Sequence, residues 1–402
     1  MKNAVIAISD DLTGSLGLSI LIRNEGLPVR ALTSFDPAAV PPFESGVLVI
    51  NTESRACNGE EAVRCTREVL EYYGPSVAVA KRFDTTLRGH LAAELDTILA
   101  ARPGAVAVVV PAYPSGKRTC VGGYQFLDGT PLERTEVAKD PGWPISHSYV
   151  PEYFRRDHEV GHVPIQRVSA GGDELLSALS EAVEQTRIVV VDAFTDNDIN
   201  TIASAAAQLP EMVIPVSPGV FVSAYLRNRY RETSNSFVLA VVGSVTDQTR
   251  DQIKQLEFRY RVAYLELPLD VIFAGKARNY TRERVSTGEF SDCDVLVLRP
   301  EARREDGRRE EIMNGLADAG SELCGSHKEQ LAGIILSGGE TATRIMDALG
   351  ATLIRPEHEF GSLIMGGVIE NGPFSGLKVV TKGGLVGDQN VLVGTLVWFL
   401  KE

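Results

Sequence analysis

Short apolar runs alternate with amphipathic segments along the first half of the chain. Each run places four to six mostly apolar residues at consecutive positions, without the polar–apolar alternation of a half-exposed strand. Such runs are typical of strands buried on both faces of a parallel sheet, with crossover helices between them. The predicted strands are 4–8, 47–51, 77–80, 105–110 and 187–192. Helical patterns between them include 59–73 and 89–101.

A second series of the same kind begins near residue 236. Its predicted strands are 237–242, 262–267, 294–298, 332–336 and 377–381. At 402 residues the chain is too long for one ordinary core, so two domains are the default expectation. We therefore expect an α/β protein of two domains, 1–230 and 236–402, each with a mostly parallel sheet flanked by helices, facing each other across a cleft. The polar stretch 228–235 is the expected linker, and 300–312 is expected to be a loop and the exposed start of a helix.

The segment 111–150 interrupts this rhythm. It is rich in proline, glycine and charge and has no clear period. A loop of this length inside a compact domain is usually functional or disordered. Four aromatic side chains argue against disorder: Tyr113, Tyr124, Phe126 and Trp143. Its basic residues would supply local positive charge for an anionic substrate: Lys117, Arg118, Arg134 and Lys139.

The composition narrows the class of function. A net charge of −13 offers no pooled positive field to a phosphate backbone, which argues against non-specific nucleic-acid binding. Five cysteines without a CxxC pair or a zinc spacing fit a reduced setting. The N-terminus lacks a signal-peptide pattern, and no apolar stretch approaches the roughly 18 residues of a membrane span. We therefore expect a cytoplasmic protein without nucleic-acid or membrane partners.

Three glycine-rich turns follow predicted strands in the second half, at 241–249, 336–345 and 381–390. Glycine at a strand-to-helix turn lets backbone N–H groups approach a ligand, and the start of a helix favours an anion. The turns match neither the Walker pattern nor the Rossmann pattern, so a nucleotide would bind by another arrangement. Asp388, beside the last turn, is either a helix cap or a functional carboxylate.

In the first half, polar residues concentrate in "AKRFDTTLRGH", 80–90, directly after a predicted strand. Arg88 suits a carboxylate because its planar guanidinium can donate two parallel hydrogen bonds. A surface turn with an Asp–Arg pair is the alternative. Asp10 and Asp11 follow the first strand, where they either cap a helix or contact a ligand.

Taken in order, these segments resemble the four-carbon acid sugar kinase family, ATP-dependent kinases of tetronate-type sugar acids. The family patterns "ADDxTGA", "KxDSTLRG" and "PAxPxxGRxTxxGxxxxDGxPLxxTxxxxDP" are similar to residues 9–15, 81–89 and 111–141. Its C-terminal "GS", "GGET" and "KxGxxG" turns are similar to 243–244, 338–341 and 382–387. The matches span nearly the whole chain, and the 111–141 stretch is the most specific.

The resemblance implies a sugar-acid-binding N-terminal domain and an ATP-binding C-terminal domain. The implied substrate-side residues are Asp10, Asp11, Arg55, Lys81, Asp84 and Arg88. The implied ATP-side residues are Ser244, Gly338, Gly339, Glu340, Thr341, Gly383, Gly384 and Gly387. The implied reaction is phosphorylation of a hydroxyl, the terminal 4-hydroxyl, of an acid such as threonate, erythronate or 3-oxo-tetronate.

On this basis Arg88, with Lys81 or Arg55, is expected to bind the substrate carboxylate. Asp10 and Asp11 would hydrogen-bond the sugar hydroxyls, and Asp11 and Asp388 compete for the role of catalytic base. The glycine turns would hold the phosphates, with Mg²⁺ bridging them through ligands that the sequence does not assign. Small departures from the patterns leave the substrate open: Ser9, Ser15, Thr85 and His90.

Two other functions fit parts of the sequence. A ribokinase-type sugar kinase is suggested by "GGLVGD", 383–388, because a glycine-rich turn precedes a catalytic aspartate in that family. A two-lobed ligand sensor also has two α/β domains, but it would need no nucleotide site. The expected partners are therefore a sugar acid and ATP, with a homodimer left open.

Overall fold

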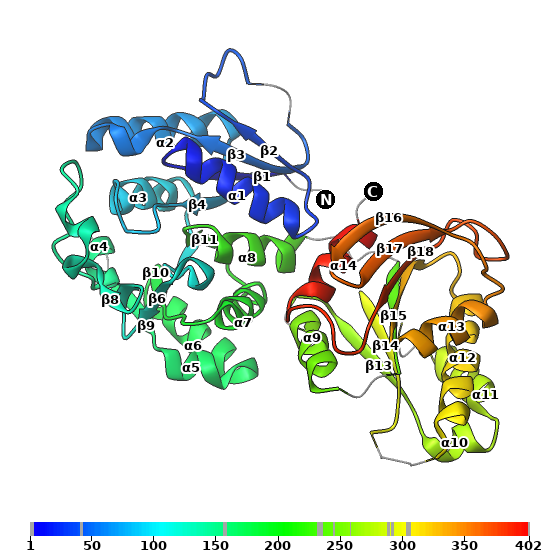
Figure 1. Cartoon of the computed structure of the whole chain (residues 1–402). Coiled ribbons are helices and arrows are strands. Elements are labelled where there is room, and N and C mark those ends of the chain that lie inside the picture. The colour runs from blue at the N-terminus through cyan, green and yellow to red at the C-terminus, as the bar shows by residue number, and fades with distance from the viewer. Residues whose placement is uncertain are drawn as a thin grey trace. The chain divides into compact units, whose positions relative to one another are not determined.

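The computed structural model describes residues 4–40, 43–155, 159–230, 236–243, 246–257, 259–287, 290, 293–302 and 307–400. The chain divides into two compact units, residues 1–232 and 233–402 (Figure 1). Each unit has its own sheet with helices on both faces, which confirms the two-domain α/β class. Within the described part of the chain, no helix combines the length and the apolar character needed to cross a membrane.

The first unit is built on an eight-stranded sheet in the order β2-β3-β1-β4-β11-β5-β10-β9. Every neighbouring pair in it is parallel. Its strands are β1 (Ala4–Ser9), β2 (Val29–Leu32), β3 (Gly46–Asn51), β4 (Ala78–Arg82), β5 (Val106–Val109), β9 (Val160–Val163), β10 (Ile188–Val191) and β11 (Val213–Ser217). The five strands predicted in this half match β1, β3, β4, β5 and β10, and the other three were not predicted.

Two helical layers cover this sheet. One layer contains α2, α3 and α4, and the other contains α1, α8, α7, α6 and α5 (Figure 1). The helices are α1 (Leu12–Asn24), α2 (Gly59–Tyr73), α3 (Leu91–Ala101), α4 (Val150–Phe154), α5 (Ile165–Ala170), α6 (Gly172–Gln185), α7 (Asp196–Ala206) and α8 (Val220–Tyr230). Because α8 continues to Tyr230, the predicted linker 228–235 begins as the last turn of a helix; residues 231–235 lie outside the described residues.

The segment 111–150 is ordered, as its aromatic residues predict. It contains a small antiparallel sheet in the order β6-β7-β8, which the sequence did not reveal. Its strands are β6 (Arg118–Val121), β7 (Tyr124–Leu127) and β8 (Thr130–Pro131). Strands of two to four residues are too short to establish a period of two.

The second unit has a seven-stranded sheet in the order β13-β14-β12-β15-β18-β17-β16. The first five strands of that order are parallel, and β17 and β16 continue it as antiparallel strands. The strands are β12 (Phe237–Val242), β13 (Val262–Leu267), β14 (Val295–Pro300), β15 (Leu331–Ser337), β16 (Ile354–Gly361), β17 (Ile364–Ile369) and β18 (Lys378–Lys382). All five strands predicted in this half are present, and the antiparallel pair was not predicted.

Two separate apolar clusters lie on the two faces of this second sheet. Alternate residues of the central strands pack against α12 and α13 on one face, and the residues between them pack against α9 and α14 on the other (Figure 1). The helices are α9 (Asp247–Glu257), α10 (Leu269–Phe273), α11 (Ala277–Ser286), α12 (Arg309–Ser326), α13 (Gly339–Ala348) and α14 (Val391–Phe399). Residues 303–306, inside the predicted loop 300–312, lie outside the described residues.

Each sheet has a switch point, where two adjacent parallel strands lead to helices on opposite faces. In the first unit β1 leads to α1 and its neighbour β4 leads to α3. In the second unit β12 leads to α9 and its neighbour β15 leads to α13. Open α/β sheets place ligands in the crevice outside such strand ends. The topology alone therefore predicts one ligand site at the ends of β1 and β4 and another at the ends of β12 and β15.

Candidate functional site

The end of β1 carries Asp10 and Asp11, which occupy the first unit's switch point. Asp11 is the N-cap of α1: its backbone is extended, and its Oδ1 atom accepts a hydrogen bond from the N–H of Gly14 at 3.2 Å. Asp10 is buried, whereas the Asp11 side chain is 27% exposed. The two neighbouring aspartates therefore differ in their access to a ligand.

Two arginines bind both aspartates. Arg55 donates from Nε to Oδ2 of Asp10 and from Nη2 to Oδ1 of Asp11, each at 2.8 Å. Arg82, at the end of β4, donates from Nη1 to Oδ1 of Asp10 at 2.8 Å and to Oδ1 of Asp11 at 2.6 Å. Buried carboxylates need this compensation, because removing a charge from water costs several kcal/mol.

The two aspartates end up with different capacities for new hydrogen bonds. Both oxygens of Asp10 already accept from an arginine. At Asp11, all recorded bonds from the described residues go to Oδ1, which leaves Oδ2 available as an acceptor. Since Asp11 is also the more exposed of the two, it has the greater capacity to contact a ligand, whereas both oxygens of Asp10 are engaged with the arginines.

The cluster continues into the loop after β4. Arg88 donates to both oxygens of Asp84, at 2.7 and 3.2 Å, and from Nη1 to Asp140 at 3.0 Å. Arg55 lies 3.7 Å from Asp84 and so joins the two halves of the network. Burial alone would raise the pKa of Asp84, but hydrogen bonds from Arg88 and Thr86, with the charge of Arg55, outweigh it and lower that pKa to about 2. Asp84 is therefore ionised across the physiological range.

Lys81 lies outside this network. Its ammonium group is 3.0 Å from a carboxylate oxygen of Glu94 on α3, and its side chain is 1% exposed. Neighbouring residues on a strand point to opposite faces, so Lys81 and Arg82 cannot both reach the aspartates. Counting back from Asp84 in the family pattern "KxDSTLRG" places Arg82, not Lys81, at the basic position. Strand alternation together with this count would have identified Arg82, which the sequence analysis missed.

Two glycines leave space for charged side chains of this cluster. A Cβ atom at Gly14 would lie 1.9 Å from the guanidinium carbon of Arg82. Gly89 has a positive φ of 104°, and a Cβ there would come within 3.3 Å of the Asp10 carboxylate. The glycines of the "DDLTG" and "TTLRG" segments therefore make room for the ion pairs.

A cavity of about 420 Å³ adjoins these groups. Its lining residues are Asp10, Asp11, Leu12, Glu53, Arg55, Ala56 and Trp143. The Trp143 indole donates to the backbone carbonyl of Arg55 at 3.2 Å, and the ring of His90 packs edge-on against it at 4.8 Å. The long loop thus supplies one wall of the cavity through Trp143, while His90 supports that wall from behind.

In the second unit the three glycine turns lie together at the switch point. The N–H of Gly338 donates to the carbonyl of Lys382 at 2.9 Å, and that of Gly243 to the carbonyl of Ser337 at 3.4 Å. Val242, Ser337 and Lys382 are register partners at the ends of their strands. Ser244, predicted as an ATP-side residue, lies outside the described residues.

Side chains of α9 and of Thr246, the residue just before it, hold the last of these turns, which runs through Gly383, Gly384 and Gly387. The amide nitrogen of Gln252 donates to the carbonyls of Val386, Gly387 and Asp388 at 3.0 to 3.1 Å. The hydroxyls of Thr246 and Thr249 donate to the carbonyl of Gly384 at 2.8 and 3.0 Å. The turn is therefore shaped by polar side chains that the sequence analysis did not single out.

The remaining predicted residues of this unit have different surroundings. Gly339 begins α13, and Glu340 is exposed and lies 2.8 Å from Arg309. Thr341 is buried, with its hydroxyl 3.5 Å from the sulfur of Met313. Asp388 is exposed and accepts the N–H of Asn390 at 2.8 Å, so it stabilises the turn before α14 without being the residue at its N-cap.

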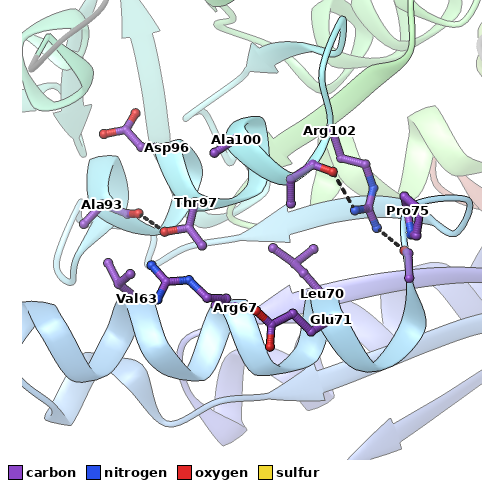
Figure 2. A pocket seen from close by; sticks show the side chains of 12 residues that line it. Val63, Arg67, Leu70, Glu71, Pro75, Ala93, Asp96, Thr97, Ala100 and Arg102 are labelled. Carbon is purple, nitrogen blue, oxygen red and sulfur yellow. Dashed lines mark hydrogen bonds between the residues drawn. The ribbon is translucent and has the colours of Figure 1, made fainter.

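A larger groove in the first unit, of about 720 Å³, lies between α2 and α3 (Figure 2). None of the residues predicted for the substrate site lines it. Its one deeply buried cation, Arg102, donates to the carbonyls of Gly74, Val77 and Ala101 at 2.8 to 3.2 Å. That arginine ties helix and strand ends together, so we place the candidate site at the cavity beside Asp11.

Two family models match this chain, one in each half. A sugar-binding N-terminal domain matches residues 5–225, and a nucleotide-binding C-terminal domain matches residues 239–392. The chain is 34% identical to a D-erythronate kinase of Heliobacterium modesticaldum, covering 97% of this chain and 95% of that protein. It is 29% identical to a D-threonate kinase of Salmonella typhimurium, covering 99% and 98% of the two chains.

One solved structure is also similar over the whole chain. It is a domain of unknown function from Bordetella bronchiseptica, described as a domain-swapped dimer with bound citrate. Its TM-score is 0.71 at 26% identity, and the match covers 99% of both chains.

Proposed function

Since this chain belongs to the four-carbon acid sugar kinase family, we propose that it transfers the γ-phosphoryl group of ATP to the terminal 4-hydroxyl of a four-carbon sugar acid. The kinase names of its relatives support a phosphotransferase that acts on a sugar acid. They support neither of the alternatives, a ribokinase-type kinase or a ligand sensor. D-Erythronate and D-threonate are the first substrates to test, because two end-to-end relatives bear those names.

The observation that carries the proposal is the arrangement at the two switch points. In the first unit, residues 1–230 in our proposed division, a charged cluster adjoins a cavity that a four-carbon acid can enter. In the second, residues 236–402, three glycine turns meet at adjacent strand ends. Carboxylates and arginines suit a polyol acid, and backbone N–H groups at a helix start suit phosphate.

For the acceptor, we propose that the free Oδ2 atom of Asp11 accepts a hydrogen bond from the reacting hydroxyl and takes its proton. The hydroxyl oxygen then forms a bond to the γ-phosphorus as the bond from that phosphorus to the β–γ bridging oxygen breaks, releasing ADP. Arg55 and Arg88, the more exposed arginines of the cluster, would bind the substrate carboxylate. Asp10, Arg82 and Asp84 would hold them in position.

For the nucleotide, the residues present fit a bound phosphate. The hydroxyl of Ser337, beside the Gly338–Gly339 turn, is buried and has no hydrogen-bond partner among the described residues. The turns Gly338–Gly339 and Gly383–Gly387 would supply backbone contacts to the phosphates. Within the described part of the chain, no group of three or more His, Cys, Asp or Glu side chains could hold a metal ion. Mg²⁺ bound to a nucleotide commonly uses one or two protein carboxylates together with phosphate oxygens and water, and here it would neutralise charge on the transferred group.

A coupled assay of ADP release tests this function. The panel contains D- and L-erythronate, D- and L-threonate and their 3-oxo forms, each with ATP and Mg²⁺. We expect turnover with at least one member and none with the corresponding neutral tetritols, because those lack the carboxylate that Arg55 and Arg88 would bind. Equal turnover with a tetritol would contradict the proposed substrate class.

The oligomeric state is part of the same proposal. The Bordetella structure is described as a domain-swapped dimer, which supports a homodimer for this chain. Light scattering during size-exclusion chromatography is expected to give twice the chain mass of 43.5 kDa. A mass of one chain at micromolar concentration would contradict it.

A further inference from the structure

The end of β18 holds a buried lysine that no carboxylate of the described residues neutralises. Lys382 is 2% exposed, and no carboxylate of the described residues pairs with its ammonium group. Its Nζ atom donates to the carbonyl of Gly383 at 2.9 Å and approaches the hydroxyl of Thr249 at 3.4 Å. Both partners are neutral. A buried cation without a counter-charge is costly, because its hydration is lost and nothing opposite in charge replaces it.

The elements around Lys382 supply no hidden compensation. The strands β12 and β15 and the helix α14 carry no charged residue at all. On α9 every charged residue is exposed: Asp247, Arg250, Asp251, Lys254 and Glu257. Asp388 in the following turn is exposed as well. Burial accordingly lowers the pKa of Lys382 from its usual value near 10.5 to about 8.

The other deeply buried lysine of the described chain shows the contrast. Lys81 is 1% exposed, and its ammonium group lies 3.0 Å from the Glu94 carboxylate. Arg82 in the same unit is likewise matched by two aspartates. At its switch point the first unit thus pairs its buried cations with carboxylates, and another buried cation of this unit, Arg102, lies away from that point and donates to three carbonyls. The second unit leaves Lys382 without a carboxylate partner among the described residues, at the strand ends where ligands bind.

A second polar group beside Lys382 is also unsatisfied. Ser337 is its register partner on β15, so both side chains project from the same face of the sheet. The Ser337 hydroxyl is 1% exposed and has no partner among the described residues. Buried polar groups are nearly always hydrogen-bonded, and this hydroxyl is free to bond to a ligand that reaches the strand ends. The next residue, Gly338, leads into the start of α13, which favours an anion.

We propose that Lys382 and Ser337 form a buried anion subsite that receives a phosphate group of the nucleotide, with Lys382 supplying the charge and Ser337 a hydrogen bond. The proposal rests on the proposed function, since it assumes that the second unit binds the nucleotide. It assigns Lys382 to the binding machinery, rather than only to the support of the Gly383 turn.

Proton uptake on binding of Mg-ADP tests this role. An anion beside Lys382 raises the pKa of its ammonium group, so near pH 8 binding should take up about half a proton. Isothermal titration in buffers of different ionisation enthalpy measures that number directly. We expect uptake in the wild-type protein and none in Lys382→Met, whose affinity for Mg-ADP should fall at least tenfold.

Two further variants separate this role from a structural one. Lys254→Met, an exposed lysine on α9, is the matched control and should keep both affinity and proton uptake. Ser337→Ala should weaken Mg-ADP several-fold and keep the uptake. Lys382→Met should melt no lower than the wild type without nucleotide, because it removes an uncompensated buried charge.

The outcomes are distinct. Wild-type binding of Mg-ADP without proton uptake, or unchanged affinity in Lys382→Met, would overturn the subsite and leave the kinase function standing. If nucleotide-free Lys382→Met melted at a lower temperature than the wild type and still took up a proton on binding Mg-ADP, the role of Lys382 would be structural. If the wild-type protein neither binds Mg-ADP nor releases ADP in the substrate panel, the proposed function fails and the subsite fails with it.

Discussion

The two switch points differ in how they stabilise polar groups at buried strand ends. In the first unit, side chains of opposite charge neutralise one another: Arg55 and Arg82 bridge Asp10 and Asp11. In the second unit, the polar groups of the last glycine turn are mainly backbone groups, and Gln252 and two threonines donate hydrogen bonds to its carbonyls. One site is fixed by ion pairs and the other by hydrogen bonds to main chain.

This difference suits the two ligands that we propose. A sugar acid presents hydroxyls and one carboxylate, so it needs donors and acceptors close together, and paired aspartates and arginines provide both. A nucleotide brings several negative charges of its own, so a site with an excess of positive charge and many N–H groups suits it. The first site should thus be sensitive to loss of a charge, and the second to the shape of its turns.

Loss of one charge in the first cluster should have the largest effect. Arg82→Met leaves Asp10 buried with one arginine instead of two. We therefore expect the free energy of unfolding of the first unit to fall by about 3–5 kcal/mol. Urea unfolding followed by circular dichroism measures this. The matched control is Arg64→Met, which removes exposed ion pairs to Glu61 and Glu68 and should cost under about 1 kcal/mol. Equal losses in both variants would show that the cluster is not held by its charges.

Asp11→Asn should nearly abolish turnover. The amide cannot take a proton from the substrate hydroxyl, so we expect kcat to fall about 100- to 1,000-fold. The ADP-release assay with the preferred sugar acid measures it, and the exposed Asp36→Asn serves as the control. Asp388→Asn addresses the competing assignment of the catalytic base. A larger loss of kcat in Asp388→Asn than in Asp11→Asn would transfer that role to the second unit.

Acid should weaken the first unit through Asp84. Its pKa is lowered to about 2 in the folded protein from an ordinary value of 3.8, so the folded state favours the ionised carboxylate. The resulting stability is present above about pH 4 and is lost as the pH falls toward 2, amounting to about 2 kcal/mol. Urea unfolding of Asp84→Asn across this range should show a shallower dependence on pH than the wild type. Parallel curves would contradict the assignment.

Gln252→Met tests the turn of the second unit and should have the smallest effect. It replaces an amide donor by a neutral thioether that cannot donate to the carbonyls of Val386, Gly387 and Asp388. We expect KM for ATP to rise about tenfold, which corresponds to about 1.4 kcal/mol, with KM for the sugar acid unchanged. Gln255→Met, on the same helix, is the control. A rise in KM for the sugar acid instead would remove the distinction between the two sites.

The sequence predicted the strands that are continuous apolar runs and missed those without that signal. The strand β16 reads "IRPEHEFG" and is largely exposed, so nothing in its composition marks it as a strand. The central strand β11 contains Pro215, which ordinarily argues against such a position. It is tolerated there because β11 pairs with β4 only at Val216 and Ser217, beyond the proline.

Site prediction had a similar limit. The motifs identified five members of one cluster, from three separate segments of the chain: Asp10, Asp11, Arg55, Asp84 and Arg88. They did not identify Arg82, because "KR" offers two adjacent cations and only the direction of each side chain decides between them. Gln252 and Lys382 were missed for a different reason. Their importance depends on contacts with turns more than a hundred residues away, or on the absence of a charged partner, and neither is visible along the chain.

The close approach of Gly14 to Arg82 has a consequence for mutagenesis of the whole cluster. A Cβ at position 14 would occupy the space of a guanidinium that two aspartates hold in place. Gly14→Ala should therefore be harmful in the native background and nearly neutral once Arg82 is shortened. Such a dependence is epistasis: the effect of a substitution at position 14 depends on the residue 68 positions further along the chain. Libraries intended to change substrate range would accordingly vary them together or leave both untouched.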